Sequence, residues 1–302
     1  MFENQGMSEN QLAKASFSYQ RRVRASRIRR ALLHRIPTPL KQRLKLSAQL
    51  CLEGVDLLLG RRKELVPPRY LRLGGDGDFE KTGDEFLGYF VQMGELQPTH
   101  RVLEIGCGIG RMARPLTKYL VNGSYEGVDI LPRGIRWCQD HFIERYPNFH
   151  FQLADVENRE YNPGGRFGAT QYRFPFGDNE FDFVYLTSVF THMLKNDMRH
   201  YLREISRTLR ANGRCLVTFF LLNEQSRKLI SAGHSSIDFR FPQDGCWSAD
   251  QGHPELAIAY DEEYIRSIYA DSSLALENLQ YGAWCGRKEY LSYQDILIAR
   301  KI

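Results

Sequence analysis

A glycine-rich segment carries the strongest chemical signal in the chain. Residues 102–110 read VLEIGCGIG, an apolar run followed by glycine at every second position, Gly106, Gly108 and Gly110. Glycine lets a backbone turn tightly and approach a ligand where a Cβ would collide, and a helix that follows offers free N–H groups. The segment predicts a ligand-binding loop between a strand and a helix, although on its own it also fits a tight turn that binds nothing.

Two acidic residues stand at matching places after the next two apolar runs. Asp129 lies 25 residues beyond Glu104, and Asp155 follows the third run. At the end of the second strand of an open α/β sheet, an acidic side chain can accept hydrogen bonds from both hydroxyls of a ribose. Since ligands bind at the carboxyl ends of such strands, the three features together predict one site for a ribose-containing ligand.

His192 is the candidate catalytic residue. It follows the fourth apolar run, and its usual pKa of about 6.5 leaves the imidazole mostly neutral and able to accept a proton at cytoplasmic pH. The alternative interpretation is that His192 caps the helix expected from about Lys195, or packs structurally. No metal site is expected, because the six cysteines form no C-x-x-C pair and no histidines cluster at metal-ligand spacing.

Short apolar runs alternate with helical stretches and would position these residues. We predict strands over 101–105, 125–128, 149–153, 181–186 and 214–220, and two final strands over 276–281 and 294–299. We predict helices near 84–93, 111–121, 133–146, 195–210 and 261–270, with Asn196 as the N-cap of the fourth. This alternation is typical of an α/β domain with a largely parallel sheet and helices on both faces.

From about Leu87 to Ile302 the chain resembles the class I S-adenosylmethionine-dependent methyltransferases. Residues 104–110 are similar to the first motif of that family, residues 127–130 (GVDI) to the second, and residues 154–156 (ADV) to the element that reads adenine. The resemblance implies a Rossmann-like, seven-stranded, mostly parallel sheet and S-adenosylmethionine as the cofactor. It implies cofactor-binding roles for Glu104, Gly106, Cys107, Gly108, Gly110, Asp129, Ile130, Asp155, Val156 and Thr187.

Within that resemblance, the glycine loop packs against the methionine part of the cofactor. Asp129 is implied as the ribose ligand, and the Asp155 carboxylate as the partner of the adenine amine. Two departures affect element boundaries. Pro115 falls early in the helix after the loop, and residues 157–173 replace the compact helix expected between the third and fourth strands. A dehydrogenase is less favoured, because the glycines do not follow the G-x-G-x-x-G spacing.

The segment after the fourth strand bears on which atom is methylated. Residues 186–192 read LTSVFTH, without the acidic or Asn residue followed by Pro-Pro-aromatic found in related enzymes that methylate adenine or amide nitrogens. No Pro-Cys nucleophile occurs for carbon methylation of pyrimidines, and Thr187 and Ser188 offer no carboxylate for a metal. We therefore predict direct displacement onto a hydroxyl of a small molecule of sugar or natural-product type, with His192 as the base.

Charge divides the 302-residue chain into two parts. Residues 1–70 carry a net charge of +10, against −5 for the rest, which predicts a basic helical arm over 1–70 and a methyltransferase domain over 71–302. Residues 222–257, with interleaved aromatic and polar side chains, are predicted to be a lid insertion that holds the acceptor or simply packs on the sheet. The absence of an apolar membrane span or a signal sequence predicts a cytoplasmic protein.

The arm leaves several partners open. Residues 14–63 hold 14 Lys and Arg against 2 Asp and Glu, alongside apolar side chains at helical spacing. We favour docking of this stripe on the catalytic domain or on a second subunit, which would make a homo-oligomer; peripheral membrane contact comes next. An RNA methyltransferase and a non-catalytic cofactor-binding scaffold are the alternative functions, and the acidic balance after Tyr70 makes nucleic acid the weaker partner.

Overall fold

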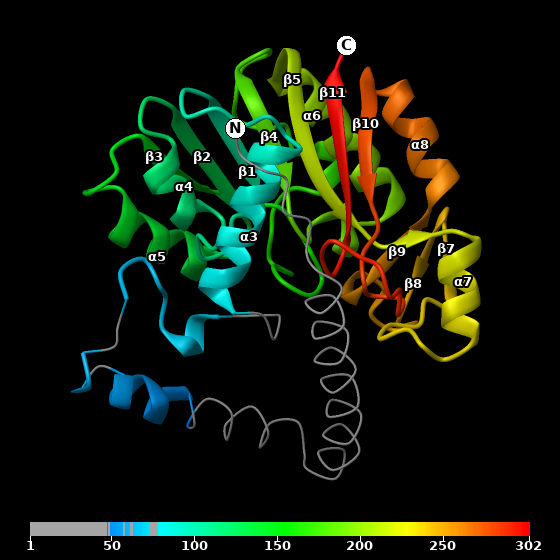
Figure 1. Cartoon of the computed structure of the whole chain (residues 1–302), viewed down its shortest axis with the longest axis horizontal. Coiled ribbons are helices and arrows are strands. Elements are labelled where there is room, and N and C mark those ends of the chain that lie inside the picture. The colour runs from blue at the N-terminus through cyan, green and yellow to red at the C-terminus, as the bar shows by residue number, and fades with distance from the viewer. Residues whose placement is uncertain (1–46, 48, 57, 61–62, 73–77) are drawn as a thin grey trace.

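A central seven-stranded sheet organises the part of the chain that the computed structural model describes, residues 47, 49–56, 58–60, 63–72 and 78–302 (Figure 1). Its strand order is β10-β11-β5-β4-β1-β2-β3. The strands are β1 Arg101–Ile105, β2 Ser124–Asp129, β3 Phe149–Leu153, β4 Phe181–Leu186, β5 Leu209–Phe219, β10 Leu274–Gln280 and β11 Asp295–Lys301. Only β11 runs antiparallel to its neighbours, so the predicted Rossmann-like, mostly parallel sheet is confirmed.

Helices cover both faces of this sheet. Successive side chains of a strand point to opposite faces, so Val102 and Phe183 join one apolar cluster while Leu103 and Val184 join the other. The first cluster includes α3 (Phe79–Gln92), α4 (Ala113–Tyr119) and α5 (Pro132–Phe142); the second includes α6 (Lys195–Thr208) and α8 (Glu262–Asp271). Short 3₁₀ turns occupy Arg69–Leu71 (η1), Ala169–Gln171 (η2), Phe190–His192 (η3) and Pro254–Leu256 (η4).

Two helix starts differ from the sequence prediction. Helix α3 begins five residues earlier than expected, because the Asp78 side chain accepts hydrogen bonds from the backbone N–H groups of Glu80 and Lys81. The N-cap of α6 is Leu194, which makes no side-chain cap, so the prediction of Asn196 was wrong. Pro115 lies in the first turn of α4, where a missing N–H is tolerated.

The predicted lid is a folded substructure, which we call the cap, residues 221–261. It holds a second sheet of order β6-β9-β8-β7 together with helix α7 and turn η4. The elements are β6 Leu221–Leu222, α7 Glu224–Ser231, β7 Phe241–Gln243, β8 Cys246–Ser248 and β9 Ile258–Asp261. Phe239 is buried against Phe220 and Trp284, so this aromatic side chain packs the cap rather than facing an acceptor.

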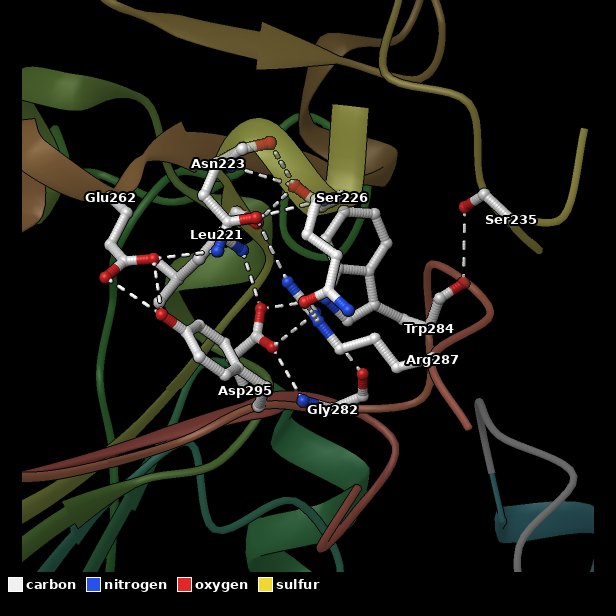
Figure 2. A network of polar contacts seen from close by, with 11 residues as sticks. Leu221, Asn223, Ser226, Ser235, Glu262, Gly282, Trp284, Arg287 and Asp295 are labelled. Carbon is white, nitrogen blue, oxygen red and sulfur yellow. Dashed lines mark hydrogen bonds and ion pairs between the residues drawn. The ribbon is translucent and has the colours of Figure 1, made fainter. Parts of the chain in front are cut away.

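A buried carboxylate anchors the cap to the central sheet (Figure 2). Asp295, the first residue of β11, accepts hydrogen bonds from the N–H of Leu221 at 2.7 Å, the indole Nε1 of Trp284 at 2.8 Å and the N–H of Gly282 at 2.7 Å. The Arg287 guanidinium lies 3.4 Å from the same carboxylate and 3.3 Å from Oδ1 of Asn223, the N-cap of α7. The start of the cap is therefore held by buried polar groups as well as by apolar packing.

Part of the basic arm is described, and its apolar stripe does not dock on the catalytic domain there, whereas docking on a second subunit stays a prediction. Residues 49–56 are helical, and Glu53 and Asp56 both accept hydrogen bonds from Arg69. Leu52, Val55 and Leu59 are 53%, 47% and 55% exposed, so docking of these side chains on the catalytic domain was wrong. The part of the predicted helical arm before residue 47 lies outside the described residues. No described helix is long and apolar enough to cross a bilayer.

Candidate functional site

The glycine loop connects the end of β1 to α4 and exposes its backbone at one position. Gly106, Gly108 and Gly110 have φ values of 85°, 54° and 75°, a region that disfavours other residues. A Cβ at Gly106 would lie 2.3 Å from Val189, and one at Gly110 would lie 2.9 Å from Phe142, whereas nothing stands within 4 Å at Gly108. Two of the glycines thus permit packing, and Gly108 leaves room for a ligand.

Asp129, at the end of β2, reaches this loop as predicted. Its Oδ2 accepts a hydrogen bond from the N–H of Gly108 at 2.6 Å, and its Oδ1 accepts one from the N–H of Leu131 at 2.8 Å. Burial raises the pKa of this carboxyl, and the backbone donors act against that rise. Each oxygen keeps a second lone pair, so the carboxylate can hold the loop and accept ribose hydroxyls at the same time.

Glu104, the penultimate residue of β1, is buried between two tyrosines. Its Oε2 accepts hydrogen bonds from the hydroxyls of Tyr125 at 2.5 Å and Tyr185 at 2.8 Å. Gly127 makes room for the first of these, because a Cβ there would lie 2.8 Å from the Tyr125 hydroxyl. Burial raises the pKa of Glu104 to about 8. Neither tyrosine was predicted as a site residue. A tyrosine within an otherwise apolar strand could have indicated them, because a buried hydroxyl needs a hydrogen-bond partner.

Asp155 follows β3 but carries a partner that the sequence did not suggest. Residues 157–167 fold back so that the N–H of Arg166 donates to Asp155 Oδ1 at 3.1 Å, and the Arg166 guanidinium forms an ion pair with Oδ2. These hydrogen bonds lower the pKa of Asp155. An adenine amine would have to share this carboxylate with Arg166 or displace it.

The other predicted cofactor residues lie on the same edge of the sheet. Cys107 and Val156 are buried, Ile130 and Thr187 are half-buried, and Ser188 beside Thr187 adopts a φ of 59°. Because β4, β1, β2 and β3 are consecutive neighbours in the sheet, their carboxyl ends bring all ten predicted residues to one edge. Among the described residues, no group of three or more His, Cys, Asp or Glu side chains could hold a metal ion.

His192 lies in η3, just after β4, against the cap. Its Nδ1 is 2.9 Å from the carbonyl oxygen of Glu255 in η4, and its ring meets the edge of Tyr161 at a centroid distance of 5.3 Å. Since a carbonyl oxygen only accepts, the proton sits on Nδ1 and the lone pair of the neutral ring sits on Nε2. Burial lowers the pKa of His192. The interpretation of His192 as the cap of α6 was wrong, because Leu194 holds that position.

Acidic side chains gather around Glu255, whose backbone carbonyl contacts His192. Glu160 forms an ion pair with His253 of the cap at 2.8 Å, and Glu255 Oε2 accepts a hydrogen bond from the N–H of Arg159 at 3.0 Å. Burial raises the pKa values of Asp197 and Glu255, and the charge of Asp197 raises that of Glu255 further. Sequence reasoning missed this acidic group, because Glu160 and Glu255 lie in irregular segments without periodicity, 157–161 and 253–256. Asp197, in the first turn of α6, gave no signal that would join it to them.

Comparison with known proteins agrees with this geometry. Residues 103–217 match the family model described as a methyltransferase domain. The chain is 29% identical over 154 residues to phosphoethanolamine N-methyltransferase 3 of Arabidopsis thaliana, covering 50% of this chain and 27% of that protein. It is 34% identical over 113 residues to phthiotriol/phenolphthiotriol dimycocerosates methyltransferase of Mycobacterium tuberculosis, covering 37% and 35%. The matches thus span about a quarter to a third of the length of these curated relatives.

A solved structure supports the fold alone. A protein of Pyrococcus horikoshii OT3 superimposes with a TM-score of 0.53 at 15% identity, covering 78% of this chain and 97% of the other. At that identity the likeness extends to the arrangement of the sheet and helices and carries no statement about substrate.

Proposed function

Through residues 103–217 the chain belongs to the class I S-adenosylmethionine-dependent methyltransferases, and from this premise we propose that it methylates a hydroxyl of a small molecule. When bound, S-adenosylmethionine supplies a methyl group activated by a sulfonium. The protein then has to align the acceptor with that methyl carbon and remove the acceptor's proton. The activity of the whole protein and the identity of its acceptor are part of this proposal.

The residues at the strand ends fit the cofactor. The open space at Gly108 admits a close backbone approach, and the Asp129 carboxylate has lone pairs left for ribose hydroxyls. Ile130 and Val156 supply apolar side chains just after β2 and β3. The Asp155 carboxylate can accept a hydrogen bond from the adenine amine if it also keeps its ion pair with Arg166. We assign these residues, with Glu104, Cys107 and Thr187, to cofactor binding.

The observation that carries the catalytic proposal is the hydrogen bond between His192 and the Glu255 carbonyl. It holds the ring in the tautomer whose Nε2 accepts a proton, and the lowered pKa keeps the ring neutral at pH 7. Both are requirements of a general base that acts on a hydroxyl. His192 lies after β4, beside the ends of β1 and β5, where an acceptor can meet the cofactor.

Transfer of label from methyl-labelled S-adenosylmethionine into fractionated cell extract tests this proposal. We expect label in a soluble small-molecule fraction with the wild-type chain and very little with His192→Ala. Label in RNA would instead favour the alternative RNA methyltransferase. Cofactor binding without any label in any fraction would favour the non-catalytic scaffold.

A second candidate acceptor is an amine. The carboxylates of Glu160 and Asp197 lie near that of Glu255, whose backbone carbonyl contacts His192, and this acidic group would attract a protonated amine. One relative is named a phosphoethanolamine N-methyltransferase, which is consistent with this candidate. Cation-exchange chromatography of the labelled product separates the two: a methylated amine is positively charged and is retained on the resin, whereas the methyl ether of an uncharged acceptor is not.

The arm gives a further partner proposal. We propose that residues 14–63 contact an anionic membrane surface peripherally, since basic side chains dominate this segment and Leu52, Val55 and Leu59 are exposed. Sedimentation with anionic and neutral vesicles tests it, with a chain that starts at Leu65 as the control. A cytoplasmic location and a homo-oligomeric state stay predictions.

A further inference from the structure

Gln294 precedes the buried anchor Asp295, at the edge of the sheet where the glycine loop lies. Because β11 is antiparallel to β5, its first residue lies beside the carboxyl end of β5, with Asp295 paired to Phe219. The Asp295 carboxylate fixes this end of β11 through the contacts drawn in Figure 2. A Cβ at Gly282 would lie 2.5 Å from the carbonyl carbon of Gln294, so the two backbones are in close contact. The main chain of Gln294 is therefore held by buried neighbours.

The side chain of Gln294 is oriented by Ser188, which follows β4. The Ser188 hydroxyl donates to Oε1 of Gln294 at 2.9 Å, and the Ser188 N–H donates to Oγ1 of Thr218 on β5 at 2.8 Å. The chain after β4 thus crosses the end of β5 to reach β11. The two N–H donors on Nε2 of Gln294 have no hydrogen-bond partner among the described residues. The structure therefore holds an oriented and unused pair of donors at this edge.

The segment that orients Gln294 also lies against the glycine loop. A Cβ at Gly106 would lie 2.3 Å from the Val189 side chain, so the residue after Ser188 packs on the loop that we assign to the cofactor. Ser188 itself is exposed, and Gln294 is half-buried. The candidate base His192 follows in the adjoining turn η3. The donors of Gln294 are therefore accessible beside the segment that carries the base and contacts the glycine loop.

We propose that Gln294 is a specificity-determining residue whose Nε2 donates a hydrogen bond to an oxygen atom of the small-molecule acceptor. An oxygen is the partner that this group selects, because a carboxamide NH2 donates and does not accept. The acceptor class is a molecule that carries a second hydroxyl, carbonyl or anionic oxygen near the hydroxyl that is methylated. Ser188 acts through Gln294 and is a positioning residue. The inference rests on the proposed function, because it needs a small-molecule acceptor beside the cofactor.

Methyl transfer at several acceptor concentrations tests this role. The probe is one batch of the small-molecule fraction of cell extract, serially diluted and assayed with methyl-labelled S-adenosylmethionine, which gives a half-saturating amount and a maximal rate. Gln294→Ala should raise the half-saturating amount about 3- to 10-fold, the effect of one lost hydrogen bond, and leave the maximal rate within about twofold of wild type. Its affinity for S-adenosylhomocysteine, measured by calorimetry, should not change. An unchanged half-saturating amount, or a loss of that affinity, overturns the inference.

Two further variants test the donor and its orientation. Gln294→Glu keeps the size of the side chain but replaces the donors with a carboxylate, so it should raise the half-saturating amount at least as much as Gln294→Ala. A value below that of wild type would mean that the position binds a cation, which overturns the inference. Ser188→Gly removes the orienting hydroxyl at a φ of 59° that glycine adopts readily, and it should raise the half-saturating amount by a smaller factor.

A control variant and a stability measurement keep the outcomes apart. Gln97→Ala is the matched control, because Gln97 is exposed, contacts only the carbonyl oxygen of Glu95 among the described residues, and precedes β1 at the opposite edge of the sheet. If the wild-type chain labels no small molecule, the proposed function fails, and the role of Gln294 fails with it. If the melting temperature shows that Gln294→Ala does not fold, Gln294→Glu and Ser188→Gly decide the matter.

Discussion

Two regions of the candidate site are assembled in different ways. We call the first the cofactor edge, the carboxyl ends of β1 to β4 where the predicted cofactor residues lie. We call the second the acceptor wall, which consists of His192 and its contacts Tyr161 and Glu255. At the cofactor edge, Asp129 binds Gly108 across 21 residues, between two neighbouring parallel strands. At the acceptor wall, His192 contacts the backbone carbonyl of Glu255 across 63 residues. The first set of contacts follows from one strand-loop-helix unit and its neighbour, whereas the second needs the cap to be docked.

This difference has a consequence for mutational effects. Changes in the wall should alter catalysis and leave cofactor affinity intact, and changes at the cofactor edge should do the reverse. The anchor at Asp295 should affect stability, because it holds the cap rather than a ligand.

Replacement of His192 should give the largest effect. His192→Ala is expected to lower the turnover number by about 100- to 10,000-fold, because the acceptor loses its base. Cofactor affinity measured by calorimetry should stay within about twofold of wild type. His141→Ala is the matched control, since Nδ1 of His141 also contacts a backbone carbonyl, that of Trp137, but His141 lies in the last turn of α5, on the other face of the sheet. An unchanged turnover number would contradict the role of His192 as the base and would leave alignment of the acceptor with the methyl group as the mechanism.

The same residue predicts the pH dependence of the reaction. Because burial lowers the pKa of His192, the base is protonated only under acidic conditions. The rate should therefore rise with pH through a value below the usual 6.5 of histidine and then stay level. This rise of the rate with pH should disappear in His192→Ala. If the variant still shows the rise at the same pH, the titrating group is another residue.

Removal of the cap anchor should be the next largest effect. Asp295→Ala leaves Arg287 buried without its carboxylate and leaves three donors unpaired, so we expect about 3–5 kcal/mol lower free energy of unfolding. Asp238→Ala is the control, because Asp238 pairs with Arg240 on the exposed surface of the cap, and it should change stability by less than about 0.5 kcal/mol. Urea unfolding measures both, and similar values for the two variants would refute the anchor.

A smaller effect is expected at the cofactor edge. Asp129→Ala should weaken binding of S-adenosylmethionine and its demethylated product by about 1–3 kcal/mol, since the ribose hydroxyls lose a charged acceptor. Asp129→Asn keeps a hydrogen-bond acceptor beside Gly108, so its affinity for the cofactor should fall less than that of Asp129→Ala. Calorimetry decides, and wild-type affinity in the alanine variant would remove Asp129 from the site.

The smallest effect is expected at the exposed ion pair between Glu160 and His253, which joins residues 157–161 to the cap. Glu160 raises the pKa of His253, so the stabilisation is present below the usual histidine pKa and is lost as pH rises through the raised value. His253→Gln should lower the melting temperature slightly at pH 5.5 and not at pH 8.5. An equal difference at both pH values would mean that the charge of His253 contributes nothing.

Most of the fold, and the position of the candidate cofactor residues at one edge of the sheet, could be predicted from the sequence, because their signals are local. The apolar run before the glycines, Asp129 after the second run and Asp155 after the third each report a strand end, and parallel strand ends share one edge. All seven strands of the main sheet were predicted, with shifts at their ends. The beginning of β5 was placed five residues late, because Leu209 pairs with Phe181 but the turn-like residues 210–213 form an irregularity before the regular pairing resumes at Arg214.

Only the tertiary structure decided the surroundings of the predicted residues. It placed two tyrosines on Glu104, Arg166 on Asp155 and the Glu255 carbonyl on His192, and it turned an irregular insertion into a folded cap. These contacts join segments 11 to 81 residues apart whose pairing leaves no periodic trace in the sequence. The types of the candidate site residues can therefore be recognised locally along this chain, whereas their protonation and orientation depend on burial and on distant partners.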